Sequence, residues 1–256
     1  MEKVETIVLP ICSNSEIYDG IISVYWIPMI KFIREKKLES KIKVFLLFGK
    51  GSNISKFKDI QENILVVDSE ECFSNILKKT ILGIQEINKK YDYDYLIRSN
   101  VSSFWHIENL VELIKTLPKK EVYAGPNNWD RYISGCGIIM SRDICQKIAD
   151  VKGINSAPDD LQMGRIANTK LSCFLEYRNS NFKYLDTKSD KISLKYKILY
   201  LISKPIDSRE YENIYKFITE NNLFQIRINS PKPYNRMEDL GFFSYLTSKL
   251  YKSGIL

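Results

Sequence analysis

Histidine is almost absent from this chain. Its 256 residues include a single one, His106. Zinc sites built from two or three histidines are therefore excluded within this chain. A Ser-His-Asp triad would have to use His106, which follows Phe104 and Trp105 at the expected start of a helix. We therefore interpret His106 as a structural residue.

Paired cysteines are also missing. The five cysteines are an odd number, and no two of them have C-x-x-C spacing. This pattern is typical of a reducing compartment, in which thiols are buried rather than bridged. The segment Met1–Glu5 precedes only a short apolar stretch, which predicts no signal peptide. We therefore expect a cytoplasmic protein.

Long apolar runs and long basic runs are absent as well. No run reaches the ~18 residues that a transmembrane helix needs, and no Lys/Arg block indicates a nucleic-acid partner. The 38 Lys and Arg residues against 31 Asp and Glu residues give a net charge of +7. This excess suits an anionic or phosphate-bearing ligand, although a solvated basic surface explains it equally well. At this length the chain can bury a sizeable core without disulfides or metals.

Short apolar runs alternate with amphipathic segments over the first hundred residues. They predict, in order, a strand over 4–11, a helix over 21–36, strands over 44–48 and 64–67, a helix over 72–88 and a strand over 95–97. Such alternation predicts an α/β fold with a mostly parallel sheet flanked by helices. Ligands of such sheets bind beyond the carboxyl ends of the strands.

The same analysis continues to the end of the sequence. It predicts a helix over 107–116, strands over 122–124 and 132–141, helices over 141–150 and 157–168, a helix over 210–220, a strand over 224–228 and a helix over 238–250. After residue 180 the chain becomes basic and apolar together. We therefore divide it into an α/β core, 1–180, and a C-terminal α+β extension, 181–256, packed on the core.

Three segments carry candidate chemistry: Tyr91–Phe104 (YDYDYLIRSNVSSF), Tyr132–Asp143 (YISGCGIIMSRD) and Pro158–Gly164 (PDDLQMG). In this order they resemble the β-1,3-galactosyl and N-acetylglucosaminyl transferases of the GT-A superfamily. In that family a strand that ends in D-x-D precedes a strand of the type [FY]-x-S-G-[GC]-G, and an E-D-V-x-x-G motif follows. The resemblance covers about residues 1–180. It implies a Rossmann-like GT-A core that binds a nucleotide sugar.

The resemblance also implies an activity. We expect an inverting glycosyltransferase of the hexosyltransferase type, which moves a sugar from a UDP-sugar to a hydroxyl of a glycan or glycolipid. Asp160 would be the general base, and Asp159 would hold acceptor hydroxyls or tune Asp160. Without the resemblance, two acids that merely cap a helix would be the better interpretation. Gly135, Cys136 and Gly137 would line the sugar site, although tight packing also explains glycines in a strand.

The first segment departs from the family pattern. Asn100, Val101 and Ser102 stand where D-x-D is expected, and neutral oxygens bind a divalent cation more weakly than carboxylates. Asp92 and Asp94 form a literal D-x-D, but we expect them in a turn before the strand, at the wrong end of the sheet. Two alternatives are open. Mn²⁺ or Mg²⁺ could bind with donor phosphates, water and Ser102, or the enzyme could be metal-independent and use basic residues. Candidates for the latter role are Arg227, Lys232 and Arg236, which solvated surface charges explain equally well, and Arg98, which could equally pair with a nearby acid.

The sequence gives weaker signals for the residues that would bind the nucleoside of the donor and the acceptor. By the fold analogy the nucleoside lies over the ends of the first two strands, at Pro10, Ile11 and Cys12 and at Phe48 and Gly49. Two tryptophans, Trp105 and Trp129, could stack on sugars or belong to the core. The basic stretch 191–204 permits contact with a membrane or with a lipid-linked acceptor, but an element that covers the core is the favoured interpretation.

Two other function classes remain. The missing D-x-D carboxylates motivate a non-catalytic sugar-nucleotide or glycan-binding module on the same fold. A nucleotidyltransferase that acts on sugar phosphates would need a Gly-rich phosphate loop, which neither 10–20 nor 49–52 supplies, so it ranks last. No motif specifies the sugar, the acceptor, the linkage or the oligomeric state.

Overall fold

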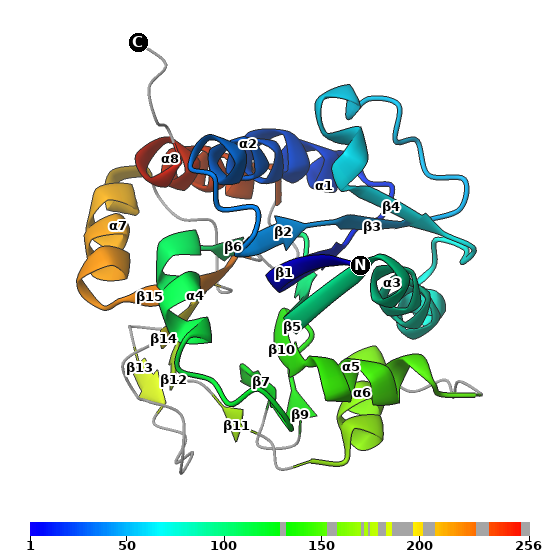
Figure 1. Ribbon diagram of the computed structural model, residues 1–256. Helices are drawn as coiled ribbons and strands as arrows, with labels where there is room; N and C mark the ends of the chain where they lie inside the picture. Colours follow the sequence, from blue (N-terminus) through cyan, green and yellow to red (C-terminus); the bar gives the residue numbers. More distant parts are fainter. Residues whose placement is uncertain are drawn as a thin grey trace.

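The computed structural model describes residues 1–128, 132–152, 158–169, 172–173, 175–178, 183–185, 197–201, 208–228 and 236–251. Within these residues the chain forms two main β-sheets with helices around them (Figure 1). Trp129 and Lys232, and most of the basic stretch 191–204, lie outside the described residues. The predictions made for them stay predictions.

The larger sheet is mostly parallel, as predicted. Its order is β11-β7-β10-β5-β1-β3-β4, with β2 also paired to β1. Only β10 runs antiparallel to its two neighbours. The strands are β1 (Glu2–Ile11), β2 (Ile42–Val44), β3 (Leu46–Gly49), β4 (Ile64–Val67), β5 (Tyr91–Asn100), β7 (Tyr123–Gly125), β10 (Gly137–Ser141) and β11 (Ser172–Cys173). This architecture is compatible with a Rossmann-like fold.

The smaller sheet has the order β13-β12-β14-β15-β6. Its strands are β6 (Ser103–Trp105), β12 (Leu175–Arg178), β13 (Lys183–Leu185), β14 (Lys197–Leu201) and β15 (Leu223–Ile228), and β8 (Asn127–Asn128) pairs separately with β9 (Tyr132–Ile133). β6 directly follows β5 in the chain and pairs antiparallel with β15, opposing Ser103 to Arg227. Strands from both sides of residue 180 thus share this sheet, and the proposed domain boundary stays a prediction.

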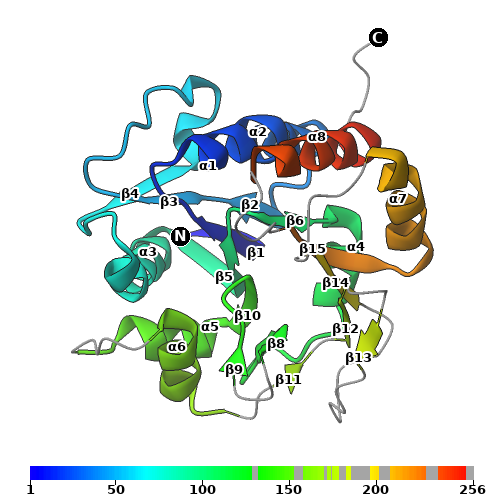
Figure 2. The ribbon, with the colours of Figure 1, turned by 180° about the vertical axis from the view of Figure 1, so that it is seen from behind.

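Helices cover both faces of the larger sheet. In Figures 1 and 2, α1, α2 and α8 lie over one face, and α3, α5 and α6 lie over the other. Their bounds are α1 (Glu16–Ile21), a π-helical segment η1 (Ile22–Trp26), α2 (Ile27–Glu35), α3 (Ile76–Lys90), α4 (Ile107–Ile114), α5 (Arg142–Ala149), α6 (Asp159–Ala167), α7 (Tyr211–Glu220) and α8 (Asp239–Leu250). Short 3₁₀ turns are η2 (Lys58–Asn63), η3 (Phe73–Asn75), η4 (Ser208–Glu210) and η5 (Arg236–Glu238). Among the described helices, none has the length and apolar character that crossing a membrane requires.

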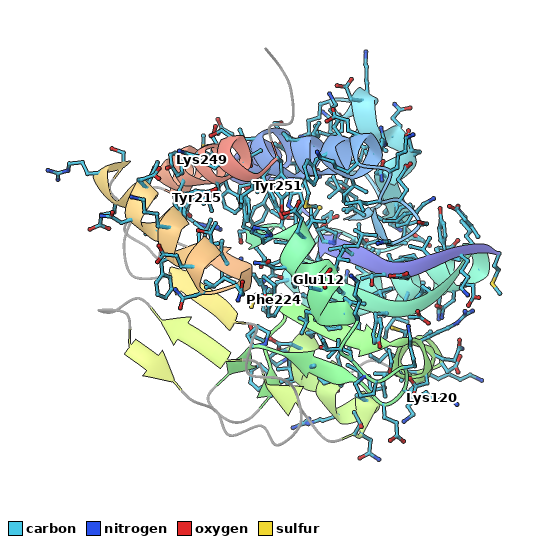
Figure 3. The ribbon with its side chains drawn as sticks, turned by 60° about the vertical axis from the view of Figure 1, so that its left-hand side comes forward. Glu112, Lys120, Tyr215, Phe224, Lys249 and Tyr251 are labelled. Atoms are coloured by element: carbon cyan, nitrogen blue, oxygen red, sulfur yellow. The ribbon has the colours of Figure 1, made fainter. Side chains whose placement is uncertain are left out.

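Alternation along the central strands builds two cores. On β5, Tyr95 and Ile97 pack toward α2 and α8, whereas Leu96 packs toward α3 and α5. The C-terminal helix is fastened to the first core by Tyr251, whose hydroxyl oxygen accepts the Ile107 N–H at 3.2 Å. Figure 3 shows Tyr251 beneath α8, and Lys249 of α8 beside Tyr215 of α7, with Nζ 5.6 Å from the ring centroid.

The predicted strand over 95–97 is too short. β5 begins at Tyr91, so Asp92 and Asp94 are strand residues rather than turn residues. The burial of the tyrosines explains the difference, because Tyr93 and Tyr95 are buried in the two cores while the aspartates pair with Arg142 and Lys119 at the surface. The two aspartates do lie at the end of β5 away from its carboxyl terminus, as expected.

The predicted strand over 132–141 is interrupted. β9 ends at Ile133 and β10 begins at Gly137, with Gly135 and Cys136 in a turn between them. The first helix starts at Glu16 rather than at residue 21, and the run 44–48 spans two short strands. The other predicted helices and strands that fall on described residues are confirmed, with ends that differ by a few residues.

Candidate functional site

A pocket of about 780 Å³ opens at the carboxyl ends of β1 and β5. Its walls come from the loop after β1, the start of α1, the turn η3 with the start of α3, the end of β5, the turn between β9 and β10, the start of α6, and β15. The place predicted from the parallel-sheet pattern therefore does hold a pocket. All three motif segments contribute to its walls.

Arg98 links the three segments. Its Nη2 lies 2.7 Å from Asp159 Oδ2, and its Nη1 lies 2.6 Å from Asn100 Oδ1. Nη1 also donates to the carbonyl oxygen of Gly135. The Arg98 side chain is buried, and an ion pair and two neutral acceptors replace part of its lost hydration, while Nε has no hydrogen-bond partner among the described residues. Of the two roles open to Arg98 in the sequence, the pairing with a nearby acid is observed, and contact with a donor stays a prediction because Arg98 also belongs to the pocket wall.

Asp160 is held at the start of α6 by two backbone donors. The Gly135 N–H donates to Oδ2 at 3.1 Å, and the Leu161 N–H donates to Oδ1 at 2.9 Å. Partial burial raises the pKa of Asp160, helped by the negative charge of Asp159 and opposed by the Gly135 hydrogen bond and by Arg98. A carboxylate on a pocket wall with a raised pKa is suited to accept a proton.

Arg227 enters the pocket from the smaller sheet. The pairing of β15 with β6 brings its guanidinium to Ser102, and Nη1 donates to Ser102 Oγ. Both residues belong to the pocket wall. Arg236, the other described C-terminal candidate, does not belong to that wall. It instead pairs with Asp239 at 3.4 Å and lies over the Tyr18 ring, 5.7 Å from its centroid.

The two glycines of the second segment have different surroundings. Gly135 lies on the pocket wall, and a Cβ there would come within 2.5 Å of Arg98 Nη1. Gly137 lies behind the wall, where a Cβ would collide with the amide of Gln225. Cys136 is buried there too, and its carbonyl oxygen accepts from Gln225 Nε2 at 2.7 Å. Gly137 and Cys136, predicted at the sugar site, are therefore packing residues.

The residues predicted to bind the nucleoside lie only partly on the pocket wall. Ile11 and Cys12 belong to the wall, whereas Pro10 is buried behind it. Burial raises the pKa of the Cys12 thiol, which is therefore neutral. The second predicted strand end is also buried, because Phe48 packs in the core and the Gly49 N–H donates to Glu71.

An ion pair in the wall was missed from the sequence. Lys79 Nζ lies 2.7 Å from Glu71 Oε2 and 2.6 Å from the carbonyl oxygen of Cys12. Lys79 is buried although the neighbouring Lys78 is exposed. Phe73, in the turn before α3, also lies at the pocket and is 81% exposed. Helical periodicity alone does not distinguish one lysine of a Lys-Lys pair from the other.

Two residues that follow β5, Trp105 and His106, have structural roles. His106 is the N-cap of α4, where Nδ1 accepts the Asn109 N–H at 3.4 Å, as the sequence interpretation predicted. Burial lowers the pKa of His106, so the ring is neutral. Trp105 is fully buried and its Nε1 donates to Ser99 Oγ at 2.9 Å, which assigns it to the core rather than to a sugar-stacking surface.

Sequence comparison gives no family and no curated relative. No protein-family model matches this chain, and no curated protein is detectably similar to it in sequence. Within the described part of the chain, no group of three or more His, Cys, Asp or Glu side chains could hold a metal ion. The support for a function therefore comes from the residues of the pocket.

Proposed function

We propose that this chain is an inverting glycosyltransferase of the GT-A superfamily. It transfers a sugar from a nucleotide-sugar donor, of the UDP-sugar class, to a hydroxyl of a glycan or a lipid-linked saccharide. One observation carries the proposal: three segments that resemble the family motifs, far apart in the sequence, contribute to one pocket with the Asp160 carboxylate in its wall. A cytoplasmic location, expected from the cysteine pattern, belongs to the same proposal.

In the proposed reaction Asp160 is the general base. Its carboxylate takes the proton of the acceptor hydroxyl while the acceptor oxygen forms a bond to the anomeric carbon of the donor. The bond between that carbon and the diphosphate breaks, and its electron pair leaves on the nucleoside diphosphate. The product is a glycoside of inverted configuration. The raised pKa of Asp160 favours this role, because a more basic carboxylate accepts the proton more readily.

Asp159 and Arg98 support the base in this mechanism. Nη2 of Arg98 lies 2.7 Å from Oδ2 of Asp159, and this ion pair fixes the first turn of α6 against β5. Asp160 follows directly in that turn. A general base must lie within hydrogen-bond reach of the hydroxyl, so rigid placement of the carboxylate contributes to rate.

A second candidate is a non-catalytic module that binds a sugar nucleotide or glycan. The neutral side chains of Asn100 and Ser102 at the D-x-D position favour it, because they supply no carboxylate for a metal. The two functions differ in one result. Asp160→Asn abolishes turnover by a transferase, whereas a binding module has no turnover to lose.

Hydrolysis of donor in the absence of acceptor tests the proposal. The purified chain would be incubated with a panel of UDP- and GDP-sugars, with thermal unfolding measured in parallel. The transferase proposal predicts that one donor is hydrolysed, that Asp160→Asn abolishes hydrolysis, and that the donor still stabilises the variant. Asp94→Asn is the matched control, because Asp94 pairs with the exposed Lys119 away from the pocket. Stabilisation without turnover would favour the binding module, and neither stabilisation nor turnover would overturn both.

A further inference from the structure

The side chains that stand at the position of the D-x-D motif do not suit a divalent cation. Mn²⁺ and Mg²⁺ prefer charged oxygen ligands. Here the two side-chain oxygens are those of Asn100 and Ser102, and each accepts a hydrogen bond from an arginine. Arg98 Nη1 lies 2.6 Å from Asn100 Oδ1, and Arg227 Nη1 donates to Ser102 Oγ.

These two contacts oppose a metal on both chemical and electrostatic grounds. A cation that used either oxygen would compete with a guanidinium group for it. It would also lie beside the guanidinium of Arg227 in a partly buried site, where like charges repel more strongly than in water. Two acids of the pocket wall, Asp159 and Asp160, are held by Arg98 and by backbone N–H groups respectively.

We propose that Arg227 binds the diphosphate of the donor directly and that donor binding needs no divalent cation. This inference rests on the proposed function and deepens it. A guanidinium group carries a permanent charge and a planar fork of donors that matches phosphate oxygens. As the bond to the anomeric carbon breaks, negative charge builds on the leaving diphosphate, and Arg227 stabilises that charge.

Arg227 is better suited to this role than Arg98. The Arg98 side chain is 3% exposed and its charge is compensated by Asp159. Arg227 is half-buried on the pocket wall, and its contact with the Ser102 hydroxyl orients the guanidinium. The register that opposes Arg227 to Ser103 fixes the backbone of Arg227 next to the end of β5. The smaller sheet thereby contributes a guanidinium group to the wall of the pocket.

Binding of nucleoside diphosphates tests the inference. Titration calorimetry on the full chain would measure UDP, GDP and the parent nucleosides, each in EDTA and with Mn²⁺. We expect one diphosphate to bind equally well in both buffers. Arg227→Gln should weaken the binding of that diphosphate about ten- to hundredfold, because a charge-assisted hydrogen bond is lost. The affinity for the parent nucleoside should stay unchanged. Arg227→Lys should retain part of the affinity.

Arg165→Gln is the matched control, since Arg165 is an exposed arginine on α6 and its replacement changes the net charge equally. Thermal unfolding of each variant verifies that it is folded. Diphosphate binding that occurs only with Mn²⁺ would overturn the inference and leave the transferase proposal standing. Equal affinity of Arg227→Gln and wild type would also overturn it. Failure of every diphosphate and nucleotide sugar to bind in either buffer would overturn both proposals.

Discussion

Arg98 and Asp159 form a buried ion pair, with Nη2 2.7 Å from Oδ2 and with side chains that are 3% and 13% exposed. Arg98 belongs to β5 of the larger sheet and Asp159 to the first turn of α6. The pair therefore fixes the position of α6 on the sheet. Because Asp160 follows Asp159 directly, the same pair places the carboxylate that we propose as the general base.

Removing Arg98 should destabilise the fold strongly. Arg98→Met keeps much of the side-chain volume but leaves the Asp159 charge buried without its partner. Breaking a buried pair in this way costs about 3–5 kcal/mol. We expect a loss of that size in the free energy of unfolding, measured by urea denaturation with tryptophan fluorescence.

Arg142→Met is the matched control for this prediction. Arg142 also pairs with an aspartate, Asp92, but the two side chains are 36% and 50% exposed. Exposed pairs contribute less than about 1 kcal/mol, because water and salt screen them. Equal losses for the two variants would show that Arg98 contributes no more than a surface ion pair.

Gly135 leaves room for the Arg98 guanidinium. In Gly135→Ala the new Cβ would lie 2.5 Å from Nη1 and 2.9 Å from Cζ, so Arg98 has to move. Overpacking of this kind costs about 1–3 kcal/mol. Donor hydrolysis should fall as well, because the Gly135 N–H holds Asp160. Urea denaturation and the donor-hydrolysis assay measure the two effects.

Gly164→Ala should have the opposite effect on stability. Gly164 lies within α6, and the nearest atom that its Cβ would meet is Tyr123 Cε1 at 3.7 Å. Replacing a helical glycine by alanine in open space stabilises by about 0.5–1 kcal/mol. If both alanine variants changed stability in the same direction, the steric argument for Gly135 would fail.

The larger sheet could be predicted because its signals are local. Runs such as VETIVLPI and VFLLF are strands by composition, and the helices between them have regular apolar spacing. The prediction for the start of β5 is wrong because aspartates are typical of turns. Here Asp92 and Asp94 are partly exposed strand residues beside the buried Tyr93 and Tyr95.

The site depends on pairings that no local pattern encodes. Lys79 bonds the carbonyl oxygen of Cys12, 67 residues earlier in the chain. Arg227 and Arg236 were equivalent candidates in the sequence. Only the antiparallel pairing of β15 with β6 brings Arg227 to Ser102, 125 residues away. Such contacts follow from the topology of the whole fold, so sequence patterns could suggest the residue types but not the partners.

The stability of the protein should depend on pH through His106. Burial lowers the pKa of His106 below its ordinary value of 6.5, so the unfolded chain binds a proton more readily than the folded chain does. The stabilising contribution is complete above about pH 6.5 and is lost as the pH falls through the lower folded-state pKa. We expect urea denaturation to give a smaller free energy of unfolding at about pH 5.5 than at about pH 7.5.

His106→Asn isolates this effect. Asparagine is a favourable N-cap residue and does not titrate, so the α4 cap is retained. His106 is the only histidine in the chain, and carboxylate effects are common to both proteins. The variant should lose less stability than wild type over the same pH interval. If the free energy of unfolding fell equally with pH in the two proteins, the pH dependence would not come from His106.

Ionisation of Asp160 should lower the stability of the fold over the same pH range in which it produces the active base. Burial raises its pKa above the ordinary value of 3.8, so its ionisation is less favourable in the folded chain. Stability linked to Asp160 is therefore present below about pH 3.8 and is lost as the pH rises through the folded-state pKa. Relative to wild type, Asp160→Asn should become more stable as the pH rises from about 4 to 7, as measured by urea denaturation.

Donor hydrolysis should show the opposite trend at the same residue. A general base acts only when it is ionised, so kcat/KM should fall on the acid side with a midpoint above pH 3.8. Asp160→Asn should stay inactive over the whole pH range, because it has no carboxylate to accept the proton. A structural Asp160 would produce the stability trend without the activity limb. The two measurements together therefore separate a carboxylate that only caps α6 from one that accepts a proton.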